Sequence, residues 1–116
     1  MTQPATSSAA RFTLALAQTK PRLGDVARNL RAHLETIARA ASQGADLVVF
    51  PELSLTGYFL RDLVPSVAIR PTQDDPVFAQ LLKASRAADV AFGFACEDER
   101  HRFTIAAAYL SGGELV

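Results

Sequence analysis

The chain has 116 residues, of which 49% are hydrophobic and 21% are charged, and its formal net charge is zero. This size suits one small globular domain, and the balanced charge gives no electrostatic reason to expect a nucleic-acid partner or an anionic membrane surface. No apolar run approaches the roughly 20 residues of a membrane-spanning helix, and the single cysteine excludes an internal disulfide framework and favours a cytoplasmic location.

The first residues differ in composition from the rest of the chain. Residues 1–10 are rich in serine, threonine and alanine, and they lack the basic start and apolar centre of a signal peptide. We therefore expect a disordered lead-in over 1–10 and a folded domain over 11–116. In residues 12–18, large apolar side chains alternate with smaller ones, which predicts a strand buried mainly on one face.

A helix is expected after this strand. Asp25 belongs to the residue types that cap helix N-termini, and Gly44 suits the left-handed position that follows a helix C-terminus. Between them, apolar residues recur at steps of three and four and predict one apolar stripe along the helix. This stripe consists of Val26, Leu30, Leu34, Ile37, Ala38 and Ala41.

The second predicted strand covers residues 46–52, which read D-L-V-V-F-P-E. Its continuous apolar run is typical of a strand that is covered on both faces. A strand, a helix and a strand in this order predict a parallel pair joined by a right-handed crossover. The chain is therefore expected to have an α/β fold.

Two helical segments are expected in the middle of the chain. Residues 62–68 predict a helical turn that is broken at Pro65. Asp75 followed by Pro76 predicts the start of a longer helix, because aspartate caps and proline fits the first turn.

Strands are expected again over residues 90–96 and 103–110. Ser111-Gly112-Gly113 then predicts a hairpin turn, and a fifth strand begins at Glu114. A strand of so few residues cannot hold its place in a sheet. We therefore expect residues 11–116 to be the N-terminal portion of a larger domain, which is truncated here.

Glu52 is the candidate catalytic residue, because it directly follows a predicted buried strand. Ligands of open α/β sheets bind outside the carboxyl ends of the strands. A carboxylate framed there by Pro51 and apolar residues would be partly removed from water, which suits a general base. On position alone, a solvated loop residue or a helix cap is an equal alternative.

The segment from Phe50 to Tyr58, F-P-E-L-S-L-T-G-Y, resembles the part of the nitrilase superfamily of carbon–nitrogen hydrolases that carries the catalytic glutamate. The flanking pieces resemble the same family in the right order: L-A-L-A-Q, the helix with Asn29, V-A-F-G-F and A-A-A-Y-L-S-G-G. The resemblance covers residues 12–116. It implies the N-terminal part of an α-β-β-α sandwich of the nitrilase type.

The resemblance also implies a mechanism, in which a Glu–Lys–Cys triad hydrolyses non-peptide carbon–nitrogen bonds of small nitriles or amides. Glu52 matches the glutamate, the general base on the cysteine thiol. The family's lysine and cysteine would both fall beyond Val116, so this chain alone is expected to be inactive. We expect Lys20 and Lys83 to face solvent and Cys96 to be a structural residue of a strand.

Two aromatic residues and two histidines are further candidates for a functional role. Tyr58 and Phe59 are candidates for lining the substrate cleft, with simple packing as the alternative. His33 and His101 have no neighbours with metal-ligand spacing, so we expect no metal, and nothing implies a cofactor. The family's aromatic-Asn-Ser-Ala run is replaced by residues 103–106, F-T-I-A, which suggests a divergent member.

Other functional interpretations remain open at this point. The alternative from another class is a small α/β binding or interaction module, or an inactive fragment, without catalysis. Residues 58–63 also have some similarity to glutaminase domains that feed ammonia to a synthetase. For the complete protein we expect a homo-oligomer.

Overall fold

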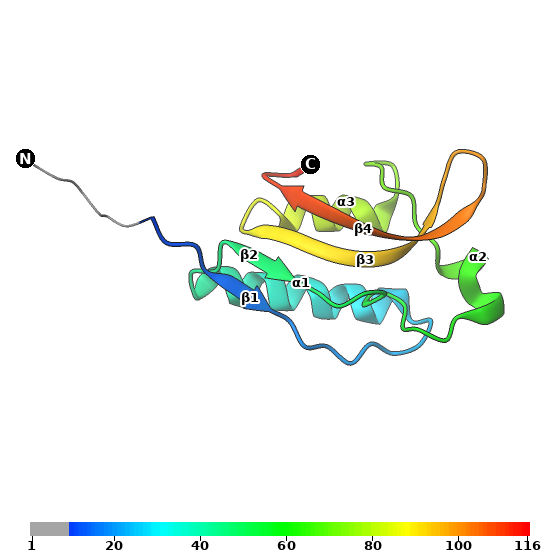
Figure 1. Ribbon diagram of the computed structural model, residues 1–116, viewed down its shortest axis with the longest axis horizontal. Helices are drawn as coiled ribbons and strands as arrows, with labels where there is room; N and C mark the ends of the chain where they lie inside the picture. Colours follow the sequence, from blue (N-terminus) through cyan, green and yellow to red (C-terminus); the bar gives the residue numbers. More distant parts are fainter. Residues whose placement is uncertain (1–9) are drawn as a thin grey trace, which may run out of the picture.

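The computed structural model describes residues 10–116, in which five strands form one mixed sheet in chain order (Figure 1). The strands are β1 (Leu14–Leu16), β2 (Leu47–Val49), β3 (Asp89–Glu97), β4 (Phe103–Ser111) and β5 (Glu114–Leu115). β1, β2 and β3 are parallel, whereas β4 runs antiparallel to β3 and to β5. The predicted α/β fold is confirmed. The lead-in expected over residues 1–10 lies outside the described residues except for its last position.

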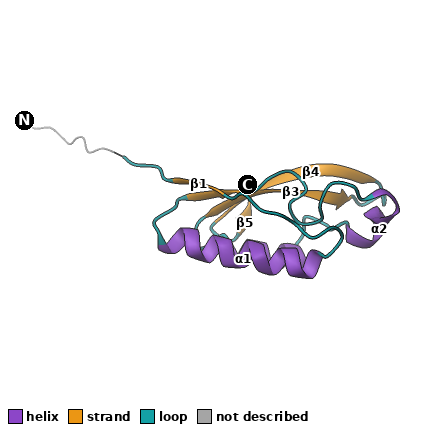
Figure 2. Ribbon diagram, turned by 90° about the horizontal axis from the view of Figure 1, so that it is seen from below, coloured by secondary structure: helices purple, strands orange, loops and turns teal. Residues whose placement is uncertain are grey.

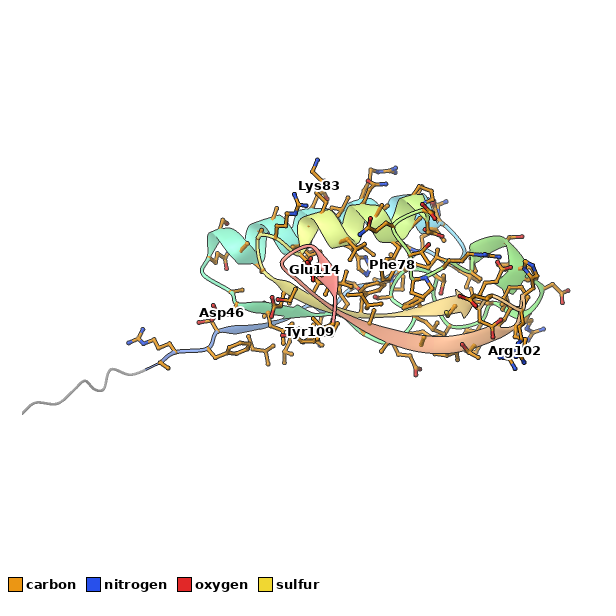
Figure 3. The ribbon with its side chains drawn as sticks, turned by 90° about the horizontal axis from the view of Figure 1, so that it is seen from above. Asp46, Phe78, Lys83, Arg102, Tyr109 and Glu114 are labelled. Carbon is orange, nitrogen blue, oxygen red and sulfur yellow. The ribbon has the colours of Figure 1, made fainter. Side chains whose placement is uncertain are left out.

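Helices pack on one face of the sheet. α1 (Val26–Ser42) and α3 (Pro76–Ala84) lie on the same side of the sheet (Figures 1 and 3), and the short η1 (Arg61–Leu63) and α2 (Val64–Val67) lie at one end (Figures 1 and 2). Both predicted caps are present. Asp25 accepts a hydrogen bond from Arg28 N at 3.1 Å, and Asp75 accepts one from Val77 N at 2.9 Å. No helix within residues 10–116 is long and apolar enough to cross a bilayer.

The hydrophobic core lies between the two long helices and the sheet. Phe78 of α3 is fully buried, and its ring centroid is 6.1 Å from those of Phe92 and Phe94 in β3 (Figure 3). Ile37 of α1 and Val48 of β2 are also buried. Because the side chains of a strand alternate between faces, every second residue of β3 and β4 contributes to this core.

The opposite face of the sheet is open. Val48 is buried, but its neighbours Leu47 and Val49 are only half-buried. Leu16 and Ile105 on the open face are 72% and 63% exposed. The pattern of residues 46–52 predicts cover on both faces, and residues 10–116 supply a helical layer on one side only, so the second face of this strand lacks a covering layer.

Two further predictions need correction. Ala38, assigned to the apolar stripe of the first helix, is exposed, whereas Asn29 and His33 of the same helix are buried. Pro65 does not break a helical turn. It lies in the first turn of α2, where its missing N–H is not needed for a helical hydrogen bond.

Candidate active site

Glu52 lies where the predicted site was placed, just beyond the carboxyl end of β2. Phe50 N still donates to Ala91 O of β3 at 2.8 Å, so the sheet ladder continues almost to the glutamate. The loop after β2 then meets the loop after β1, and Gly24 N donates to Thr56 O at 2.8 Å. Two loops at adjacent strand ends are thus joined beside Glu52.

A tight turn follows Glu52. Leu53 adopts φ 53°, which is a left-handed conformation that costs a bulky residue about 1–2 kcal/mol. Its carbonyl accepts hydrogen bonds from Thr56 N at 3.1 Å and Gly57 N at 2.8 Å, and its side chain is 4% exposed. Burial and hydrogen bonding together hold this strained residue in place, and they fix the direction in which Glu52 leaves the sheet.

β3 passes directly against this turn at Gly93. A Cβ atom at Gly93 would lie 2.9 Å from Leu53 N and 3.0 Å from Glu52 Cα, closer than real Cβ atoms approach such groups. Glycine is therefore required at position 93, because only a residue without a side chain lets the backbone of Glu52 contact β3 this closely.

Two buried polar residues of α1 hold the loops around Glu52. Asn29 donates from Nδ2 to Arg22 O at 2.9 Å and to Leu55 O at 2.8 Å, and its Oδ1 accepts from Arg22 N at 2.8 Å. One side chain thereby fastens the loop after β1 and the loop after β2 to the same helix.

His33 lies one helical turn beyond Asn29 and is 1% exposed. Its Nδ1 is 2.7 Å from Asn29 O, its Nε2 is 2.7 Å from Ser54 Oγ, and its ring stacks on Phe50 at 4.1 Å. Burial lowers the pKa of the imidazole, although the hydrogen bond to Asn29 opposes the shift. Because a carbonyl can only accept, the neutral ring carries its proton on Nδ1, and Ser54 donates to Nε2.

Sequence reasoning missed Asn29 and His33 as elements of the site. Both are polar, so they were not assigned to the apolar stripe, and their partners are far along the chain. The available signal was their spacing: Asn29, His33 and Ile37 recur at steps of four and share one face of α1.

Glu52 itself is exposed and borders two cavities. One, of about 430 Å³, lies between the loops after β1 and β2, and its lining includes Gln18, Thr19, Lys20 and Tyr58. The other, of about 360 Å³, lies on the open face of the sheet and is lined by Val49, Ala91, Gly93, Ile105 and Ala107. The partial desolvation expected for Glu52 is not found, because residues 10–116 place no layer over this face.

The predicted cleft residues have different surroundings. Tyr58 is 53% exposed and lines the cavity of about 430 Å³ beside Glu52. Phe59 is 79% exposed. The backbone thus brings Tyr58 together with Glu52, whereas Phe59 projects into solvent.

The lysines and the cysteine are distributed around the fold. Lys20 and Lys83 are exposed, as expected; Lys83 projects from α3 away from the sheet (Figure 3), but Lys20 lines the cavity with Glu52. Cys96 packs against the core on the helical side of β3, and burial raises the pKa of its thiol. A protonated, partly buried thiol is a poor nucleophile.

Comparison with known proteins adds to this geometry. Residues 13–113 match the sequence model described as carbon-nitrogen hydrolase. The glutamine-dependent NAD(+) synthetase of Acinetobacter baylyi is 36% identical over 104 residues, which are 87% of this chain and 18% of the synthetase.

Two solved structures have the same fold as this chain. The glutamine-dependent NAD+ synthetase of Acinetobacter baumannii, solved with ADP, superposes with a TM-score of 0.72 at 30% identity, over 90% of this chain and 20% of the synthetase. An amidase variant from Nesterenkonia sp. AN1 superposes with a TM-score of 0.76 at 25% identity, over 90% of this chain and 40% of the amidase. That structure carries the acetamide moiety of fluoroacetamide covalently bound at the active site cysteine. The chain spans only about a fifth of the synthetases that it resembles.

Proposed function

The chain belongs to the carbon–nitrogen hydrolase family, and we propose that it forms the part of such a hydrolase that supplies the general base, Glu52. The observation that carries this proposal is the presentation of Glu52. The carboxylate follows a parallel strand, its backbone rests on Gly93, and the turn after it is fixed by hydrogen bonds while its side chain stays free beside two cavities. A free carboxylate on a rigid support suits proton transfer.

In the proposed reaction, Glu52 accepts the proton of a cysteine thiol as the thiolate attacks the carbon of an amide. The carbon–nitrogen bond then breaks, and the same proton passes from Glu52 to the leaving nitrogen, which departs as ammonia or an amine. Water hydrolyses the resulting thioester, with Glu52 as the base once more and the thiol as the leaving group. A lysine ammonium group stabilises the oxyanion formed in each step. A nitrile would pass through a thioimidate instead.

The thiol and the ammonium group are proposed to come from chain outside these 116 residues. Cys96 packs against the core on the helical face, and Lys83 projects from the far side of α3, so neither is directed toward Glu52 (Figure 3). Lys20 lines the cavity with Glu52, but it lies in the first loop, whereas the family resemblance places the triad lysine after the fifth strand. The relatives are much longer than this chain, which spans only 18% of the A. baylyi synthetase, so their remaining residues could supply both groups. The amidase structure in which the acetamide moiety of fluoroacetamide is covalently bound at the active site cysteine supports a thiol nucleophile in the family.

We further propose that the substrate is the side-chain amide of glutamine and that the product is ammonia. The support is the similarity to synthetases that are described as glutamine-dependent, over 87% of this chain. The cavity beside Glu52 is lined by Gln18, Lys20 and Tyr58 among others, and these side chains can form hydrogen bonds with an amide.

The experiment uses the complete protein that contains this chain, assayed for ammonia release from glutamine, butyramide and butyronitrile. Glu52→Gln is expected to lower kcat at least about 100-fold, the usual lower range for loss of a positioned base, without changing the unfolding temperature. Glu35→Gln, an exposed glutamate of α1, is the matched control and should be fully active. Normal turnover by Glu52→Gln would exclude Glu52 as the base. Absence of turnover by the unmodified protein on all three substrates would favour a binding module.

A further inference from the structure

We infer that His33 is a positioning residue for Glu52, acting through contacts on both sides of it in the chain. Its ring stacks on Phe50, two residues before Glu52, and its Nε2 is hydrogen-bonded to Ser54, two residues after it. This inference rests on the proposed role of Glu52 as the general base.

The contacts of His33 are short and shielded from water. The centroids of the His33 and Phe50 rings are 4.1 Å apart with the planes inclined by 19°, and the Nε2 to Oγ distance is 2.7 Å. His33 and Ser54 are each 1% exposed, and Phe50 is 5% exposed. Water cannot reach this buried hydrogen bond to replace a missing partner, so loss of either side chain leaves the other polar group unpaired.

The third contact of the imidazole determines its orientation. Nδ1 donates to Asn29 O at 2.7 Å, so the ring cannot turn over without losing this bond. Asn29 in turn holds Leu55 O at 2.8 Å. Hydrogen bonds from α1 therefore hold the turn after Glu52 at Ser54 and Leu55, while Gly93 of the sheet contacts the backbone of Glu52 and Leu53 from the other side.

The geometry explains why a positioning residue is needed here. Leu53 is strained at φ 53°. The side chain of Glu52 is exposed, so its own packing does not hold it in position. Relaxation of the strained turn would move the carboxylate, and a displacement of about 1 Å at a reacting group can cost about 100-fold in rate. His33 opposes this relaxation because it contacts both arms of the turn.

The test compares kcat and KM in the complete protein. Ser54→Ala removes only the hydroxyl, and His33→Phe keeps an aromatic ring against Phe50 but loses both hydrogen bonds. Each variant is expected to lower kcat about 10-fold or more while KM changes less than about twofold, because the base is displaced but the binding groups are not. Ile37→Val, one turn further along α1 and also buried, is the control for a purely structural loss and should keep kcat.

A double-mutant comparison separates positioning from stability. Once Glu52→Gln has removed the base, adding Ser54→Ala should cause no further loss of turnover. Normal kcat in Ser54→Ala, or an equal additional loss in the Glu52→Gln background, would overturn the positioning role while Glu52 remained the base. Full activity of Glu52→Gln alone would instead overturn the proposed function, and this inference with it.

Discussion

Gly93 of β3 supports Glu52 through backbone contact, since a Cβ atom at Gly93 would lie only 3.0 Å from Glu52 Cα. The same Cβ would lie 2.9 Å from Leu53 N, so the contact spans the junction between strand and turn. The candidate base is therefore positioned partly by the absence of a side chain on the neighbouring strand.

This contact predicts the effect of Gly93→Ala. The added methyl group must push the backbone of Glu52 away from the sheet, so we expect kcat to fall about 10-fold or more and the stability to fall by about 1–3 kcal/mol. Kinetics and thermal unfolding of the complete protein check this. Gly44→Ala is the matched control, because Gly44 has φ 90° but no atom within 4 Å of an added Cβ. It should lose stability and keep kcat, and a similar loss of kcat in both variants would contradict the prediction.

The burial of His33 predicts how stability depends on pH. Because burial lowers the pKa of His33 from its ordinary value of 6.5, the unfolded chain binds a proton more readily than the folded one. Stability is then fully present above about pH 6.5 and declines as pH falls below that value, by at most about 1.4 kcal/mol per pH unit. The lowered pKa values of Glu97 and Asp98 act in a different range, below about pH 4.5.

Urea unfolding at several pH values between 7.5 and 5 checks this prediction. His33→Gln lacks the buried imidazole, so its stability should fall less between pH 6.5 and 5 than that of the unmodified protein. His101→Gln is the control, because His101 is exposed and its loss should leave the decline between pH 6.5 and 5 in place. A pH-independent stability of the unmodified protein would show that His33 is not held in its neutral form.

The order of helices and strands could be predicted from the sequence because it depends on local signals. Apolar periodicity located α1 and β3, and the carboxylates of Asp25 and Asp75 cap the two long helices as predicted. The strand ends were less accurate: β1 spans only Leu14–Leu16 of the predicted 12–18, and hydrogen bonds at Thr13 O and Ala17 N continue the pairing with β2 at its two ends.

The surroundings of Glu52 were not predictable, because they depend on contacts between distant residues. His33 and Ser54 are separated by 21 positions, and a polar residue in a helix gives no sign of a partner in a later loop. The exposure of Glu52 depends on whether a second layer covers the sheet. The apolar pattern of β2 indicated such a layer, but residues 10–116 do not supply it. The identity of the candidate base came from the family resemblance, and its support on Gly93 came from the structure.

The open face of the sheet leads to a prediction about the isolated 116-residue chain. Leu14 and Leu16 of β1 and Ile105 of β4 are 49%, 72% and 63% exposed, and Tyr109 projects from the side opposite the helices (Figure 3). Monomeric proteins rarely expose a continuous apolar surface of this kind, and the edge strands β1 and β5 offer unpaired backbone groups in addition. We therefore expect the chain by itself to self-associate through this face.

Sedimentation velocity and amide hydrogen exchange check the prediction, with one variant directed at the face and one away from it. Ile105→Lys places a charge on the open face and should shift the chain toward monomer, since burying an unpaired charge in an interface is costly. Ala38→Lys adds the same charge on the exposed side of α1 and should leave the association unchanged. A monodisperse, unmodified monomer with strongly protected amides in β2 and β3 would show instead that one helical layer is enough to stabilise this sheet. In that case the apolar face would need no second layer, and a self-sufficient binding module would become the better account of the chain.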